Sequence, residues 1–353
     1  GECDLALAGG VSLMITPRGF VEFSRLRGLS SSGRCKSFSD DADGASWADG
    51  CGMVVLERLA DAQRRGHQVL ALIRSSAVNQ DGKSQGLTAP NGPAQERVIR
   101  RALTLADLSP ADIDYVEAHG TGTTLGDPIE AGALANVFGR ERPAGQPLWL
   151  GSLKSNLAHA QAAAGVGGLM KVVLSLMHEQ LPRTLHAERP TRHVAWEESG
   201  LALLQQPQPW ARAQRVRRAG VSAFGISGTN AHLSVEEAPL TAATAAQPAT
   251  AFAQAPWLLP VSARSEAALR KQAAQLLAHV DQNPGLSLSE AAATLLFGRT
   301  HFEWRAVVRA ASRQELELRL SALARGAELP GLVQAPARAA MQGKLVFVFP
   351  GHG

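Results

Sequence analysis

The sequence has few cysteines and no segment typical of a membrane span. Its three cysteines, Cys3, Cys35 and Cys51, lie 32 and 16 residues apart and form no close pair of the kind that binds a metal. An odd cysteine count without a secretory signal peptide indicates a reducing, cytoplasmic environment. The longest uncharged run, residues 239–263, contains four prolines and many Thr, Gln and Ala residues, which predicts a linker instead of a membrane helix.

The sequence also lacks a dense basic block. Lys and Arg number 35 against 31 Asp and Glu, so the net charge is only +4. The basic residues are scattered and are not interleaved with aromatic residues, which favours a solvated surface over a nucleic-acid-binding face. We therefore expect no nucleic acid and no membrane among the partners of this chain.

The hydrophobic fraction of 45% and the charged fraction of 19% are typical of a folded protein with a sizeable core. Up to residue 238, short apolar runs alternate with helical patterns, which predicts a layered α/β domain. One predicted amphipathic helix begins near residue 92 and repeats apolar side chains at helical spacing. Its predicted buried face consists of Val98, Ile99, Ala102, Leu103 and Leu105.

A second unit is predicted after a Pro/Ala-rich linker at 239–256. Residues 257–340 combine two apolar strand patterns with three helical patterns, which predicts a small α+β domain. Ser265 and Ser312 precede two of these helices and are predicted to be their N-caps. Residues 341–353 are predicted to form an apolar strand and the start of a turn, as at the beginning of a further domain.

The stretch YVEAHGTGTTLGDPIEA, residues 115–131, places His119 between a predicted strand and a Gly/Thr loop. Asp127 followed by Pro128 and Glu130 has the pattern of a helix start, with Asp127 as N-cap and Glu130 as the third helical residue. Glu130 is thus either a simple capping residue or part of a site. His119 is either a loop histidine or a catalyst.

The stretch GSLKSNLAHAQAAAG places Lys154 and His159 on either side of a Ser-Asn turn before a long uncharged helix pattern. A buried lysine needs an acidic partner, and Glu130 is the predicted one. His159 is predicted near a helix start, where the helix dipole would keep it neutral. The alternative is a core histidine with no catalytic role.

The stretch GVSAFGISGTNAH predicts two strands around a glycine-rich turn that presents Phe224. Backbone N–H groups in such a turn can stabilise an oxyanion, although the segment can equally be a plain hairpin. Two neutral imidazoles can polarise a thioester carbonyl and stabilise an enolate. Together with Lys154, these features predict carbonyl chemistry. A metal site is not predicted, because His119 and His159 are 40 residues apart and the lysine would repel the ion.

In this order, the three stretches resemble the β-ketoacyl synthase domain of modular type I polyketide synthases. The upstream stretches GRCKSFSDDADGASWADGCGMVVLERL and NQDGKSQGLTAPNGPAQERVIRRAL resemble it too. The resemblance covers residues 1–238 as a C-terminal portion of the domain, while residues 257–340 resemble the ketosynthase–acyltransferase linker domain. Residues 341–353 resemble the first strand of an acyltransferase. The resemblance to the ketosynthase domain implies a thiolase-like αβαβα fold and a decarboxylative Claisen condensation.

The resemblance also implies roles for individual residues. It makes His119 and His159 the catalytic histidines and makes Lys154 an electrostatic partner paired with Glu130. We expect both imidazoles to face one pocket, within reach of a single substrate carbonyl.

Four further residues take roles from the same resemblance. Phe224 is expected to be the gate, with the oxyanion hole formed by the backbone of Phe224 and Gly225. Thr121 and Thr123 are expected to contact the phosphopantetheine arm of an acyl carrier protein. No tightly bound cofactor is expected.

The sequence departs from the family pattern in its nucleophile. The family's catalytic cysteine lies in a Thr-Ala-Cys-Ser-Ser-type turn, and no such turn occurs among these 353 residues. Cys35 and Cys51 match non-catalytic positions. We therefore expect a fragment that is inactive by itself. At the position before His159 the family usually has glycine, and Ala158 is expected to avoid a positive φ.

The expected partners are an acyl carrier protein, the acyltransferase domain of the same chain, the N-terminal half of the ketosynthase, and a second copy in a homodimer. Two alternatives stay open. One is a non-catalytic structural or docking remnant of a synthase module. The other is the ketosynthase region of a fatty acid synthase.

Overall fold

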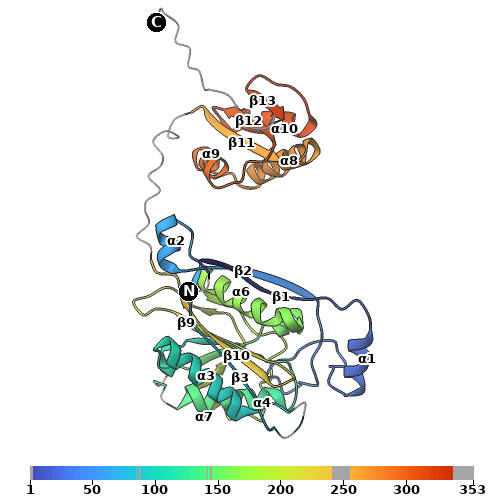
Figure 1. Cartoon of the computed structure of the whole chain (residues 1–353), viewed down its shortest axis with the longest axis vertical. Helices are drawn as coiled ribbons and strands as arrows, with labels where there is room; N and C mark the ends of the chain where they lie inside the picture. The colour runs from blue at the N-terminus through green and yellow to red at the C-terminus, as the bar shows by residue number, and fades with distance from the viewer. Residues whose placement is uncertain are drawn as a thin grey trace, which may run out of the picture. The chain divides into compact units, whose positions relative to one another are not determined.

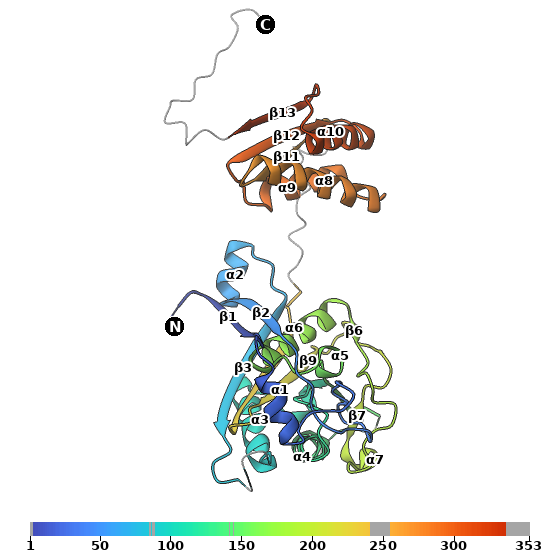
Figure 2. The same cartoon turned by 90° about the vertical axis from the view of Figure 1, so that its right-hand side faces the viewer.

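A six-stranded mixed sheet organises the first part of the chain (Figures 1 and 2). The first three strands are antiparallel and the rest run parallel. In spatial order the strands are β3 (Ala71–Gln80), β10 (Thr229–Glu237), β9 (Arg218–Phe224), β4 (Tyr115–Glu117), β5 (Leu148–Gly151) and β7 (Leu201–Leu203). All three residues of β4 are buried, because β4 lies between β9 and β5 with helices over both faces.

The structure is a computed structural model that describes residues 3–84, 86, 89–140, 142–143, 145–240 and 255–336. The chain divides into two units between Pro239 and Leu240. Most of the predicted linker at 239–256 lies outside the described residues, and so does the predicted acyltransferase strand at 341–353. No helix among the described residues is long and apolar enough to cross a membrane.

Helices α3 (Gly92–Ala106) and α4 (Gly126–Leu134) pack on one face of the large sheet. The predicted apolar face of α3 is buried at Val98, Ile99, Ala102 and Leu103. Leu105 is 49% exposed, so that part of the prediction was wrong. It lies on the flank of the helix, where a leucine side chain no longer reaches the sheet.

Helix α6 (Ala164–Met177) covers the opposite face, between the large sheet and a ribbon formed by β1 (Leu5–Ser12) and β2 (Gly50–Glu57) (Figure 1). Glycines allow close approach on both sides of this helix. A Cβ on Gly168 would lie 3.0 Å from Cγ of Glu117, and the helix-facing glycine of the ribbon, Gly52, would meet Val166 at 2.7 Å. The layers are therefore ribbon, helix, sheet and helices.

The outer face of the β1–β2 ribbon is apolar and exposed. Leu7 is 69% exposed and Val11 65% exposed on β1, and Met53 and Val55 are exposed on β2. Only the alternate side chains of β1 turn toward α6.

The remaining elements of the first unit connect these layers. They are α1 (Arg18–Arg25), α2 (Leu59–Arg65), α5 (Lys154–Leu157), β6 (Gln180–Leu181), α7 (Trp196–Ser199), β8 (Gln208–Pro209), and short 3-10 or π turns at Pro110–Asp112, Ala135–Gly139 and Gln161–Ala163.

The second unit is a three-stranded antiparallel sheet with three helices, as the α+β prediction requires. The hydroxyls of Ser265 and Ser312 accept the backbone N–H groups of Ala268 and Glu315, both at 3.2 Å, which confirms the two predicted N-caps. Its elements are β11 (Trp257–Ala263), α8 (Glu266–Gln282), α9 (Leu288–Phe297), β12 (Trp304–Ala310), α10 (Arg313–Arg325) and β13 (Leu332–Pro336).

Candidate active site

Two buried carboxylates hold the loop that follows β4. Glu130 accepts the backbone N–H groups of His119 at 2.7 Å and Gly120 at 2.8 Å. Asp127 accepts those of Gly122 and Phe38 at 3.1 and 2.7 Å. Burial raises the pKa of Asp127 to about 6 and that of Glu130 to about 7, against the opposing effect of these hydrogen bonds.

The predicted helix start was wrong by two residues, because Asp127 was expected to be the N-cap and the N-cap is Leu125. Helix α4 begins at Gly126, whose N–H donates to the hydroxyl of Thr123 at 3.1 Å. Asp127 is inside the helix, and its carboxylate folds back on the preceding loop. The sequence pattern of a cap therefore marks a carboxylate pair that orders the loop of His119.

The structure brings the two predicted catalytic histidines together. The ring centroids of His119 and His159 are 5.3 Å apart, with planes at 86°. His159 is held by its backbone, since its N–H donates to the carbonyl of Ser46 and its carbonyl accepts the N–H of Ala48. Trp47 packs against its ring at 5.2 Å.

Hydrogen bonds fix the same tautomer in both rings. Nδ1 of His119 accepts the backbone N–H of Phe224 at 3.2 Å, and Nδ1 of His159 accepts that of Gln161 at 2.9 Å. In a neutral imidazole the other nitrogen then carries the proton, so both Nε2 atoms are hydrogen-bond donors.

Both rings are held neutral. Burial lowers the pKa of His119 well below its usual value, and the nearby Lys154 ammonium lowers it further. Burial and the charge of Lys154 lower the pKa of His159 to about 3. His159 lies in the turn between α5 and α6, close to a helix start as predicted, and the effect of the helix dipole on it stays a prediction.

Lys154 is buried at the start of α5, with 6% of its surface exposed. Lys154 forms no ion pair within 4.0 Å in the part of the chain described, because Glu130 is occupied by the His119 loop, so the two predicted partners interact only through their charges. Burial lowers the pKa of Lys154, and the charges of Glu117 and then Glu130 oppose that shift.

The predicted oxyanion donors are occupied in this structure. The Phe224 N–H donates to His119, and the Gly225 N–H donates to the carbonyl of Thr229 at 2.7 Å. The tight turn between β9 and β10 pairs the Gly225 N–H internally, whereas the Phe224 N–H points to the loop that follows β4. The ring centroid of Phe224 lies 5.8 Å from that of His119.

Thr121 and Thr123 lie side by side on the loop, with their hydroxyls 3.4 Å apart and both residues partly exposed. Thr123 already accepts the N–H of Gly126, so Thr121 has the freer hydroxyl. The loop between β4 and α4 can thus present one hydroxyl donor beside His119.

The three cysteines differ in environment. Cys35 is buried, its thiol exchanges hydrogen bonds with the backbone of Ser46, and burial raises its pKa. A buried, protonated thiol is a poor nucleophile. Cys3 and Cys51 are exposed. The described residues contain no group of three or more His, Cys, Asp or Glu side chains that could hold a metal ion.

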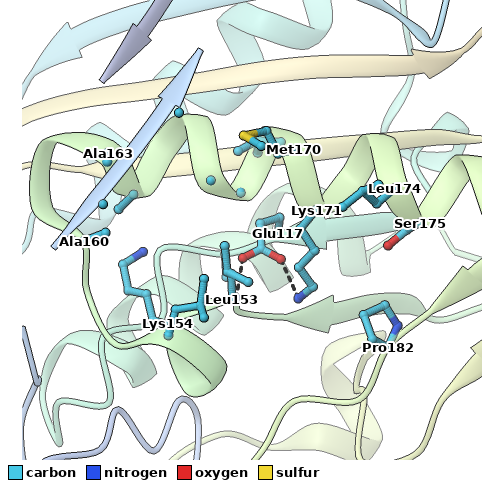
Figure 3. A pocket seen from close by; sticks show the side chains of 18 of the residues that line it. Glu117, Leu153, Lys154, Ala160, Ala163, Met170, Lys171, Leu174, Ser175 and Pro182 are labelled. Carbon is cyan, nitrogen blue, oxygen red and sulfur yellow. Dashed lines mark hydrogen bonds and ion pairs between the residues drawn. The ribbon is translucent and has the colours of Figure 1, made fainter. Parts of the chain in front are cut away.

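A cavity of about 530 Å³ lies along α6, and Lys154 reaches its wall (Figure 3). Glu117 and Lys171 form part of the same wall, and their charged atoms are 2.7 Å apart. The sequence reasoning missed this pair. Two features of the sequence could have indicated the pair. Glu117 is a lone acid in a predicted buried strand, and Lys171 is the only Lys, Arg, Asp or Glu between Ser155 and Met177.

Family models match the chain in three segments. The "Beta-ketoacyl synthase, N-terminal domain" matches residues 1–62, the "Beta-ketoacyl synthase, C-terminal domain" matches 70–188, and the "Ketoacyl-synthetase C-terminal extension" matches 190–308. The chain belongs to the β-ketoacyl synthase family. Its first unit has the thiolase-like fold expected from the motifs.

Relatives of this ketosynthase are modular polyketide synthases. The chain is 56% identical over its whole length to the spectinabilin polyketide synthase system protein NorA' of Streptomyces orinoci, and 55% identical to the mycoketide-CoA synthase of Mycobacterium tuberculosis. It spans 10% and 8% of the length of these two relatives.

Solved ketosynthases have the same fold. The ketosynthase from module 6 of the bacillaene synthase of Bacillus subtilis is 37% identical, with a TM-score of 0.84 over 95% of this chain and 58% of that one. An oxazolomycin ketosynthase domain of Streptomyces albus is 36% identical, with a TM-score of 0.86 over 96% and 58%.

Proposed function

We propose that this chain supplies the two catalytic histidines, the lysine and the phenylalanine gate of a polyketide ketosynthase active site. The observation that carries the proposal is the pair of neutral imidazoles, His119 and His159, with their Nδ1 atoms occupied and their Nε2–H groups free to donate. Two such donors can bind one thioester carbonyl oxygen and stabilise the enolate that forms when carbon dioxide leaves the extender unit.

In this proposal an acyl chain is held as a thioester on a cysteine from the N-terminal half of the ketosynthase. The extender is a malonyl-type thioester on an acyl carrier protein. Loss of carbon dioxide leaves an electron pair on the extender's α-carbon, which attacks the acyl carbonyl and releases the cysteine thiolate. Lys154 keeps the site positive and the histidines neutral, which favours the developing enolate charge.

Two further assignments belong to the same proposal. Thr121, with support from Thr123, contacts the phosphopantetheine arm, and no tightly bound cofactor is needed. Phe224 gates the approach to His119. The oxyanion on the acyl group requires an N–H other than those of Phe224 and Gly225, or a rearranged turn in the acylated enzyme.

The exposed apolar ribbon and the cavity along α6 support the N-terminal half of the ketosynthase as a partner. An exposed apolar surface of this kind is typical of an interface. We also propose two further partners, the acyltransferase domain of the same chain and a second copy in a homodimer. The proposed location is the cytoplasm.

The test uses the synthase that contains this chain, with an acyl-thioester and a labelled malonyl carrier protein. His119→Ala and His159→Ala should each lower the condensation rate by at least about 100-fold, because removal of one such donor typically has that effect. His67→Ala is the matched control, since His67 is exposed in the same unit and pairs with Glu57. Equal rates in all three variants would favour the structural or docking alternative.

A further inference from the structure

Glu117 is the last residue of β4 and makes three polar contacts with one carboxylate. Its Oε1 accepts the backbone N–H of Leu153 at 2.6 Å. Its Oε2 lies 2.7 Å from Nζ of Lys171 and also accepts the hydroxyl of Tyr115. Figure 3 shows the carboxylate between Leu153 and Lys171 on the cavity wall.

These contacts join two segments that carry the proposed catalytic groups. Glu117 is two residues before His119, and Leu153 immediately precedes Lys154. No other side chain in the described part of the chain accepts the Leu153 N–H, and this bond spans 36 residues of sequence. A shift of the turn at Leu153 would therefore move Lys154 and the short helix that leads to His159.

Lys171 is the counter-ion of the buried Glu117 carboxylate. Glu117 is 3% exposed and Lys171 8% exposed. A buried ion pair contributes little net stability compared with apolar side chains of similar size, so stability alone does not account for this one. Its specific effect is to hold an acceptor oxygen at the N–H of Leu153.

We propose that Glu117 is a positioning residue of the ketosynthase site, with Lys171 as its counter-ion. It fixes the turn at Leu153 and so places Lys154 and His159 relative to His119. The expected effect on catalysis rests on the proposed function. The positioning role itself is supported by the geometry alone. Glu117 touches neither histidine, so it acts only through the segments it joins.

The electrostatics agree with this placement. Among the charges that raise the pKa of Lys154 against its burial, that of Glu117 has the largest effect. The other titratable groups around Lys154 are Glu130, Cys35, Asp127, His119 and His159.

The test removes the charges of both Lys171 and Glu117. It then compares a side chain at residue 117 that can accept the Leu153 N–H with one that cannot. In a Lys171→Met background, Glu117→Gln keeps one oxygen for the Leu153 N–H, whereas Glu117→Leu keeps none. In the full synthase, the Leu variant should lower kcat by about 10- to 100-fold, as expected for a misplacement of about 1 Å. The Gln variant should stay within about fivefold of the wild type, about the effect of one net hydrogen bond. KM for the carrier-bound extender should change little in both.

The matched control is another buried acid–base pair of the same sheet. Nη2 of Arg217 lies 2.7 Å from Oε2 of Glu237, near the end of β10 remote from Phe224. Arg217→Met with Glu237→Leu should ease unfolding and leave kcat per folded molecule unchanged. If the two residue-117 variants have equal kcat, or if the control loses as much as the Leu variant, the positioning role is wrong.

A second measurement separates this inference from the proposed function. Amide NMR of the 353-residue chain reports the turn directly, without turnover. The Leu153 and Lys154 resonances should move strongly in the Leu variant and remain near those of the Lys171→Met parent in the Gln variant. If the synthase does not condense at all, the proposed function fails, while these shifts still decide whether Glu117 sets the turn.

Discussion

Ala158→Gly is expected to stabilise the first unit, although Ala→Gly substitutions usually destabilise. Ala158 ends α5 with φ 64° and ψ −174°, and its N–H donates to the carbonyl of Lys154 at 2.9 Å. This corrects the expectation that Ala158 avoids a positive φ. A left-handed φ with an extended ψ is a region that glycine occupies and a Cβ disfavours.

The magnitude follows from two opposing effects. Backbone strain of this kind costs about 1–3 kcal/mol, which glycine would release. Glycine loses about 0.5–1 kcal/mol more in conformational entropy on folding than alanine. The expected net change is therefore a gain in the free energy of unfolding that lies between about 0 and 2.5 kcal/mol and is centred on about 1 kcal/mol.

Native-state hydrogen exchange of the amides in β4 and β9 measures this free energy for the first unit separately from the second. The control is Ala160→Gly in the same turn, where φ is −76° and ψ is 24°. There glycine releases no strain and should destabilise by about 0.5–1 kcal/mol. If Ala158→Gly destabilises as much as the control, the strain at Ala158 does not exist and the reasoning is refuted.

Two other predictions concern ionisable groups. Burial lowers the pKa of His232 from 6.5 to about 4, so the unfolded chain binds its proton at a higher pH than the folded chain does. The stability that depends on neutral His232 is present above pH 6.5 and is lost as the pH falls toward 4. In His232→Gln, the free energy of unfolding measured by hydrogen exchange should depend less on pH between these two values. An unchanged pH dependence would contradict the assignment. The second prediction is that the 353-residue chain alone will not condense an acyl-thioester with malonyl carrier protein, since it contains no Thr-Ala-Cys-Ser-Ser-type turn and its Cys35 thiol is buried and protonated. Intact-mass analysis should show no acyl-enzyme competent for condensation, and labelled product from this chain alone would refute it.

The sequence predicted the parts of the site that depend on local pattern. The strand before His119, the alternation of strands and helices, and the caps at Ser265 and Ser312 all follow from interactions within a few residues. The helix start at Asp127 was nearly correct for the same reason.

The contacts between distant segments could not be predicted in this way. The direction of the Phe224 N–H depends on the register of β9 and β10 and on where β4 ends. The partner of Lys171 is 54 residues away in a strand, and the positive φ of Ala158 results from how α5 joins the next turn. The missing ion pair between Lys154 and Glu130 has a similar origin, because Glu130 was already satisfied by the loop backbone.

The central claim is that His119 and His159 are neutral imidazoles that both present Nε2–H. Nitrogen-15 NMR of the histidine-labelled chain, with His119→Gln and His159→Gln for assignment, measures tautomer and protonation directly. We expect both rings to be the neutral Nε2–H tautomer at pH 7, and His159 to remain neutral on acidification until the pH approaches about 3. A proton on Nδ1 of either ring, or a titration of His159 near its ordinary pKa of 6.5, would contradict the account.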